Sequence, residues 1–198
     1  MSDHVDEVAE NVLFQSLALL KTPALAELDT RQEQAYVLMR LGFVAHQDRR
    51  NYLEKSLRYY TALGDLEGIV DGCYQAFWLI DWLEDIENLL TKYLEQLHQS
   101  GDTERIVRAL LVLGYKARND GNYDRSFQRY DQAYAEAHIG GNPMGMANAR
   151  LYAGHLCQFL GEFDDALHCA EEGLEICRQT GYQNLSVVFF TSNPTVLN

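Results

Sequence analysis

The residues whose side chains could do chemistry are few in this 198-residue chain, and they are scattered. No two of its four cysteines have the C-x-x-C spacing of a redox or metal-binding pair. The six histidines form no H-E-x-x-H motif, and no P-loop, G-x-G-x-x-G or G-x-S-x-G sequence is present. We therefore predict no catalytic residue, no metal site and no cofactor. The cysteines are expected to be reduced and mostly packed in the core; they are Cys73, Cys157, Cys169 and Cys177.

Two carboxylate pairs, Asp164-Asp165 and Glu171-Glu172, also fail to indicate catalysis, because both lie opposite the apolar positions of their segment. A solvated helix face accounts for them. The net charge is -13, so a nucleic-acid backbone or an anionic membrane would be repelled, and neither is an expected partner.

Arginines provide the clearest local charge signal. Five of them gather within 25 residues, and a guanidinium suits a carboxylate or a backbone carbonyl. This basic cluster lies on an otherwise acidic chain and consists of Arg105, Arg108, Arg118, Arg125 and Arg129.

The elements that carry these residues repeat along the chain. Residues 113–133 and 153–173 match at a constant offset of 40, with glycine at both Gly114 and Gly154. Apolar or small residues follow at steps 0, 3, 4, 7, 10, 11 and 14 from Tyr123 and again from Phe163. This spacing predicts one face of a helix and excludes a strand.

Weaker copies precede these two, so we predict four helix pairs at about 30–64, 65–101, 102–141 and 142–182. Each pair ends at a glycine suited to a left-handed helix end. The next residue is an expected N-cap in three cases, namely Asp65, Asp102 and Asn142. The segment from Thr30 to Glu33 has the sequence of a capping box.

The pattern resembles the tetratricopeptide repeat. The small residue of that motif corresponds to Gly42, Gly114 and Gly154, and its aromatic residue after the turn to Tyr123 and Phe163. The pair at 65–101 departs from the motif, since Phe77 takes the small position. The resemblance implies an all-α fold, a right-handed α-α superhelix of about four helix pairs. The long repeat is similar to that of bacterial transcription regulators, response-regulator phosphatases and spindle-orientation adaptors.

The two ends are expected to differ from the repeats. Residues 1–29 should hold an amphipathic capping helix, with apolar positions at Val5, Val8, Ala9, Val12, Leu13, Leu17 and Leu20. Residues 183–198 begin a partial fifth helix that Pro194 stops. The apolar run from Leu185 to Phe190 predicts a homodimer through this edge or cover by a downstream segment; burial against the fourth pair is the alternative.

The resemblance also implies a concave groove lined by the first helix of each pair. The first pair would contribute Tyr36, Met39, Phe43 and His46, and the second Asp71, Tyr74 and Trp78. The third would contribute Arg108, Leu111, Tyr115, Arg118 and Asn119, and the fourth Asn148, Leu151, His155 and Gln158. Core packing is the alternative for Tyr74, Trp78 and Tyr115.

Together these features predict a module that binds a protein or peptide in its groove, as a cytoplasmic adaptor or as the sensor part of a regulator. The acidic N-terminal sequence is unlike a secretory or transit signal. Two alternatives stay open: a fragment of a larger signalling or transcription regulator, and a phosphatase acting on response regulators.

Overall fold

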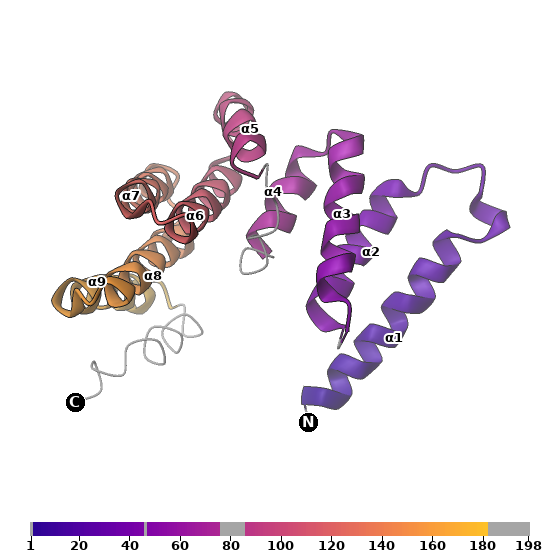
Figure 1. Cartoon of the computed structure of the whole chain (residues 1–198), viewed down its shortest axis with the longest axis horizontal. Helices are drawn as coiled ribbons and strands as arrows, with labels where there is room; N and C mark the ends of the chain where they lie inside the picture. Colours follow the sequence, from indigo (N-terminus) through magenta and orange to yellow (C-terminus); the bar gives the residue numbers. More distant parts are fainter. Residues whose placement is uncertain (1, 46, 76–85, 182–198) are drawn as a thin grey trace. The chain divides into compact units, whose positions relative to one another are not determined.

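The computed structural model describes residues 2–45, 47–75 and 86–181, and over these residues the chain is helical, with no strand. The predicted all-α class is therefore confirmed for them. The chain divides into two compact units, Met1–Ile80 and Asp81–Asn198 (Figure 1). No helix within the described ranges is long and apolar enough to cross a bilayer.

The first unit contains α1 (Ser2–Leu20), a short 3-10 helix η1 (Pro23–Leu25), α2 (Arg31–Val44), α3 (Arg49–Leu63) and α4 (Leu66–Gln75). Helix α1 packs on α2 through Leu17, which is buried against Leu38 and Leu41. Val8 and Val12 of α1 are more than half exposed. Two of the apolar positions predicted for this capping helix are thus not covered in the structure.

Helices α2 and α3 form a hairpin held by two close contacts. A Cβ placed on Gly42 would lie 2.3 Å from Cγ of Leu53, so only glycine lets α3 approach this closely. The buried hydroxyl of Ser56 donates a hydrogen bond of 2.7 Å to the carbonyl oxygen of Ala35. Both contacts tie the second helix of the pair to the backbone of the first.

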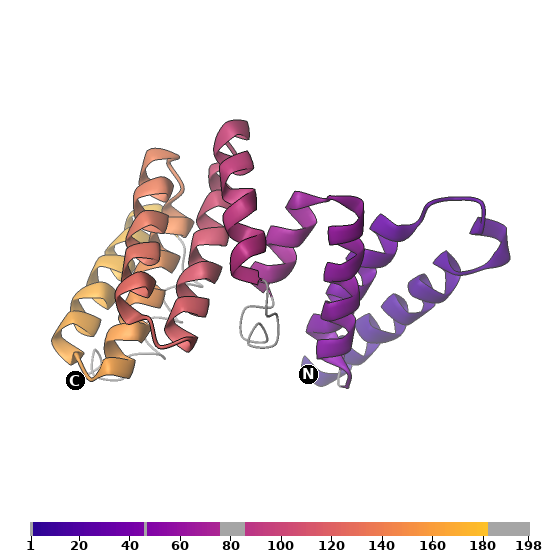
Figure 2. The ribbon, with the colours of Figure 1, turned by 45° about the horizontal axis from the view of Figure 1, so that its top comes forward.

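The second unit contains α5 (Ile86–Ser100), α6 (Thr103–Asn119), α7 (Tyr123–Ile139), α8 (Pro143–Leu160) and α9 (Phe163–Thr180). Each of these helices packs against the next one in the chain, and α6 also contacts α8 directly (Figure 2). The ranges 102–141 and 142–182 thus each hold two helices joined by a short turn.

Helices α6 and α7 approach each other closely at Gly114. A Cβ on Gly114 would lie 2.4 Å from Cε1 of Tyr130, whose side chain is 1% exposed. The fully buried Ser126 donates a hydrogen bond of 2.8 Å to the carbonyl oxygen of Gly114. The equivalent contact of α8 with α9 is looser, because a Cβ on Gly154 would lie 3.2 Å from Cβ of Cys169.

Arg150 links three helices of this unit. Its guanidinium carbon lies 4.1 Å from the centroid of the Tyr134 ring on α7. It forms ion pairs of 3.5 Å with Asp131 on α7 and of 2.8 Å with Glu172 on α9. Glu172 is therefore not the purely solvated carboxylate that its sequence position indicated.

The predicted turns are largely confirmed. Gly64, Gly101, Gly141 and Gly181 have positive φ angles, as left-handed helix ends require. The side chains of Asp65, Asp102 and Asn142 accept hydrogen bonds from the backbone N–H three residues later.

The capping box at Thr30 is wrong, because the Thr30 side chain accepts no backbone N–H of α2. Its hydroxyl accepts instead from the Gln34 side chain, and the Arg31 N–H donates to Asp29. A carboxylate in the loop has taken the role that the motif assigns to threonine.

Some predicted features lie outside the described residues. These are His46, Trp78, Phe77 and the C-terminal segment 183–198, with its proposed self-association. The predicted helix pair at 65–101 falls across the boundary between the two units, so α4 and α5 are described separately.

The contact of Gly114 with Tyr130 yields a stability prediction. Replacing Gly114 by alanine should lower the free energy of unfolding by about 1–3 kcal/mol, because the added methyl group overpacks a buried ring. Gly154→Ala, at the looser contact, should cost less. Urea denaturation followed by circular dichroism measures both.

Glu171→Ala on the exposed face of α9 is the control and should stay within about 0.5 kcal/mol of wild type. If Gly114→Ala proves as stable as the wild type, the close approach of α6 and α7 is contradicted.

Candidate functional site

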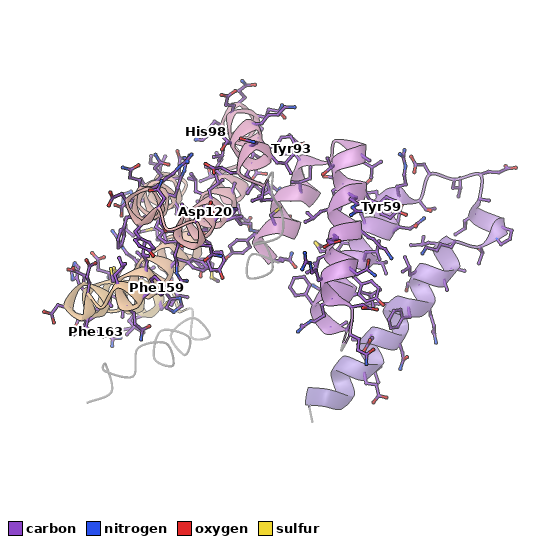
Figure 3. The ribbon with its side chains drawn as sticks, in the orientation of Figure 1. Tyr59, Tyr93, His98, Asp120, Phe159 and Phe163 are labelled. Atoms are coloured by element: carbon purple, nitrogen blue, oxygen red, sulfur yellow. The ribbon has the colours of Figure 1, made fainter. Side chains whose placement is uncertain are left out.

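An open pocket of about 470 Å³ lies in the second unit where α6 ends, α7 begins and α8 ends. Asp120 and Phe159, two residues of its wall, are labelled in Figure 3. Its lining combines two cations, one carboxylate, one amide and two aromatic rings, from Lys116, Arg118, Asn119, Asp120, Tyr123 and Phe159.

Helix ends and caps bring these side chains together. The Asn122 side chain accepts a hydrogen bond of 3.2 Å from the Arg125 N–H, which starts α7 immediately before Tyr123. The direct contact of α6 with α8 then brings Phe159 to the end of α6. The end of α6, the start of α7 and the end of α8 therefore lie next to one another at the pocket.

Arg118 is the central residue of the pocket. Its guanidinium carbon lies 5.7 Å from the centroid of the Tyr115 ring and 4.9 Å from that of Phe159. Each such cation–π contact contributes about 0.5–2 kcal/mol, depending on exposure. The two rings hold the Arg118 side chain on the wall of the pocket without using its N–H groups.

The charge of Arg118 has no carboxylate partner within the part of the chain that the structure describes. Six other basic residues of the second unit have one, namely Arg105, Arg108, Lys116, Arg125, Arg150 and Arg178. Lys116, on the same pocket wall, pairs with Asp120 one turn later.

The sequence explains this difference. Helical ion pairs join residues three or four apart. Lys116 has Asp120 at that spacing, whereas the positions three and four residues from Arg118 hold Gly114, Tyr115, Gly121 and Asn122. No neighbour on its own helix can therefore neutralise Arg118, and its guanidinium makes no hydrogen bond among the residues described.

An aromatic row extends from the pocket into the core. The Tyr130 and Tyr152 rings stack with centroids 5.9 Å apart, and Tyr152 meets the His155 ring edge-on at 6.5 Å. Burial raises the pKa of Tyr130 to about 12. Burial, and then the charge of Arg118, lowers the pKa of His155 below its usual 6.5.

The predicted groove residues of the second unit have different surroundings. Arg118, Tyr115, Asn119 and His155 lie at or beside the pocket. Arg108 pairs with Glu104 instead. Asn148 and Gln158, both on α8, are half-buried.

Three predicted lining residues are not accessible, and one of them, Met39 in the first unit, is 5% exposed. Leu111 is 2% exposed and Leu151 is 7% exposed, the latter packed with Ala147 and Leu174. Their helices turn these positions toward the core, so neither leucine can contact a partner.

In the first unit, Tyr36 on α2 is 56% exposed and Tyr74 on α4 is half-buried. Phe43 is half-buried, with the Arg40 guanidinium 6.0 Å from its ring.

Sequence reasoning missed several pocket residues. Phe159 lies one helical turn after His155, and Asp120 one turn after Lys116, so helical spacing could have found both. Tyr123 was interpreted only as a repeat aromatic, but it lies 5.9 Å from the Phe159 ring and forms part of the wall.

Other chemistry is not favoured by the geometry. In the described segments no group of three or more histidine, cysteine or acidic side chains is placed to hold a metal ion. None of the four cysteines, all of which lie in the described segments, forms a disulfide, and burial raises the pKa of Cys157 to about 12. Such a thiol is a poor nucleophile near neutral pH.

Comparison with known proteins gives no assignment. No protein-family model matches the chain, and no curated protein is significantly similar to it.

The charge of Arg118 can be tested through His155. In Arg118→Gln the pKa of His155 should rise, yet stay below 6.5, because burial is the larger cause and remains. An NMR pH titration of the imidazole signals measures this. The unfolded state binds the proton more readily, so His155 lowers the stability of the fold as the pH falls through 6.5.

His98 is the internal control for this titration. Hydrogen bonds to the Leu94 carbonyl and to Glu136 raise its pKa, and Arg118 is not among the causes. Its titration should be unchanged in Arg118→Gln. A His155 pKa that does not move would show that the Arg118 charge is not beside it.

Proposed function

We propose that the chain is a protein- or peptide-binding module of the tetratricopeptide-repeat kind, with its helix pairs arranged as a right-handed superhelix. Three features support this architecture. Helix hairpins follow one another, a glycine of the first helix faces a side chain of the second in three of them, and α6 of one pair contacts α8 of the next. The 40-residue period of the sequence agrees with it.

The unpaired Arg118 carries the functional proposal. A cation held between two aromatic rings on the wall of an open pocket, without a carboxylate of its own, favours a partner that supplies the missing group. Arginine and aromatic residues are also the side chains that dominate binding energy at protein interfaces. The exposed ring of Phe159 adds apolar contact area next to this charge.

A peptide fits this site better than a small molecule does. The pocket is open and largely polar, whereas ligand sites for small molecules are enclosed and mostly apolar. A chain segment crossing an open pocket can place a side chain in it and obtain further contacts outside. The proposal includes the role of a cytoplasmic adaptor or of the sensor part of a regulator, which the resemblance of the sequence to long tetratricopeptide repeats implies.

The test is selection of binders from a random peptide library, followed by calorimetric titration of the selected peptides. Arg118→Ala and Phe159→Ala should each weaken binding by about 1–3 kcal/mol, because each removes an interface anchor. Circular dichroism checks that the variants stay folded.

Phe163→Ala is the matched control, since Phe163 is 62% exposed, as Phe159 is at 58%, but does not line the pocket. Its binding should equal that of the wild type. If no peptide is selected, or if the selected peptides bind all three variants equally well, the proposed site is refuted.

A further inference from the structure

We infer that the pocket accepts an acidic peptide, with one side-chain carboxylate on the edge of the Arg118 guanidinium and an apolar side chain two residues away on Phe159. This inference rests on the proposed function and specifies the chemistry of the partner. It follows from the available N–H donors of Arg118, from the single unpaired charge of the pocket wall and from the short distance between Arg118 and Phe159.

The ring contacts of Arg118 leave its N–H donors available to a partner. Both aromatic contacts are made by the guanidinium carbon over a ring, at 5.7 Å and 4.9 Å. The N–H groups of a guanidinium lie in its plane and match the two oxygens of a carboxylate. The two ring contacts therefore hold the side chain in place, and its N–H donors, which make no hydrogen bond among the described residues, remain available to a partner.

The pocket can balance only one negative charge of a ligand. Lys116 is already paired with Asp120, and both line the wall, so the pair adds no net positive charge. Arg118 alone is left to balance an incoming anion. A phosphate group, with close to two negative charges, would meet only one unpaired cation and the Asp120 carboxylate.

The net charge of the whole chain also favours a ligand with one negative charge over a ligand with several. At -13 the chain repels a strongly acidic ligand, so a single carboxylate is tolerated better than a run of them. A carboxylate side chain, which carries one negative charge, is therefore favoured over a phosphorylated residue.

Phe159 and Tyr123 offer an apolar contact next to Arg118. Phe159 is 58% exposed, and the Tyr123 ring lies 5.9 Å from it at an interplanar angle of 56°, so two tilted rings provide apolar surface beside the cation. The guanidinium carbon and the Phe159 centroid are 4.9 Å apart. An extended peptide presents residues i and i+2 on one side about 6.6 Å apart, close enough for both side chains to reach their partners. The expected motif is Asp or Glu, any residue, then Leu or Phe.

The experiment uses fluorescence polarisation with labelled nonapeptides whose C-termini are amidated, so that only side chains can supply the anion. The central residue is Glu, Gln or phosphoserine, and the residue two positions later is Leu, Phe or Ser. The full chain is compared with Arg118→Gln, Arg118→Lys and Phe159→Ala. Arg178→Gln is the control, since the exposed Arg178 pairs with Glu175 on α9, outside the pocket.

On the wild type, the change from Glu to Gln in the peptide should weaken binding at least tenfold. On Arg118→Gln the same change should make no difference, which locates the carboxylate on Arg118. Arg118→Lys should recover only part of the loss, because lysine lacks the planar donors. Arg178→Gln should bind as the wild type does.

Equal binding of the Glu and Gln peptides, or tighter binding of the phosphoserine peptide, would overturn the inference. If binding of the peptides were nevertheless weakened in Phe159→Ala, the proposed function would stand and only the inference about the carboxylate would fail. If no peptide in the set distinguished Phe159→Ala from the wild type, the failure would belong to the proposed site.

Discussion

The absence of a side chain at Gly114 determines the arrangement of the second unit around the pocket. Without a Cβ, α6 lets the Tyr130 ring lie against its backbone, and Ser126 completes the contact with a hydrogen bond to the Gly114 carbonyl. Tyr130 then stacks on Tyr152 of α8, so one glycine sets the distance of both α7 and α8 from α6. The positions of Arg118 and Phe159 depend on this spacing.

The electrostatics of the pocket arise from residues only two positions apart. Lys116 and Arg118 lie on the last turns of the same helix, but only Lys116 has a carboxylate at helical spacing. Burial and the Arg118 charge both disfavour protonated His155, so that ring stays neutral beside the pocket. The lack of a carboxylate partner for Arg118, in a chain of net charge -13, results from this local spacing.

Much of the fold could be predicted because its signals are local. Helix faces follow from the spacing of apolar residues, and the turns follow from glycine with Asp or Asn after it. The exceptions depend on tertiary neighbours. Thr30 lost its capping role to Asp29, and Val8 and Val12 remain exposed although they continue the apolar pattern of α1.

The site was predictable in part for the same reason. Arg118 and Tyr115 belong to one helix face, so their proximity follows from spacing alone. Leu111 lies one turn earlier, yet the packing of neighbouring helices buries it, and this cannot be read from one helix. The place of Phe159 depends on how α8 crosses α6, which a periodic pattern does not specify.

The contacts of Arg150 have a consequence for how α7, α8 and α9 are held together. Arg150 is bound by Glu172 from α9, but also by Asp131 and the Tyr134 ring from α7. If the contact with Glu172 were lost, Arg150 would still have the Asp131 carboxylate and the Tyr134 ring, so its charge would not be left without a partner. The contacts of Arg150 with Asp131 and Tyr134 therefore join α7 to α8 independently of α9.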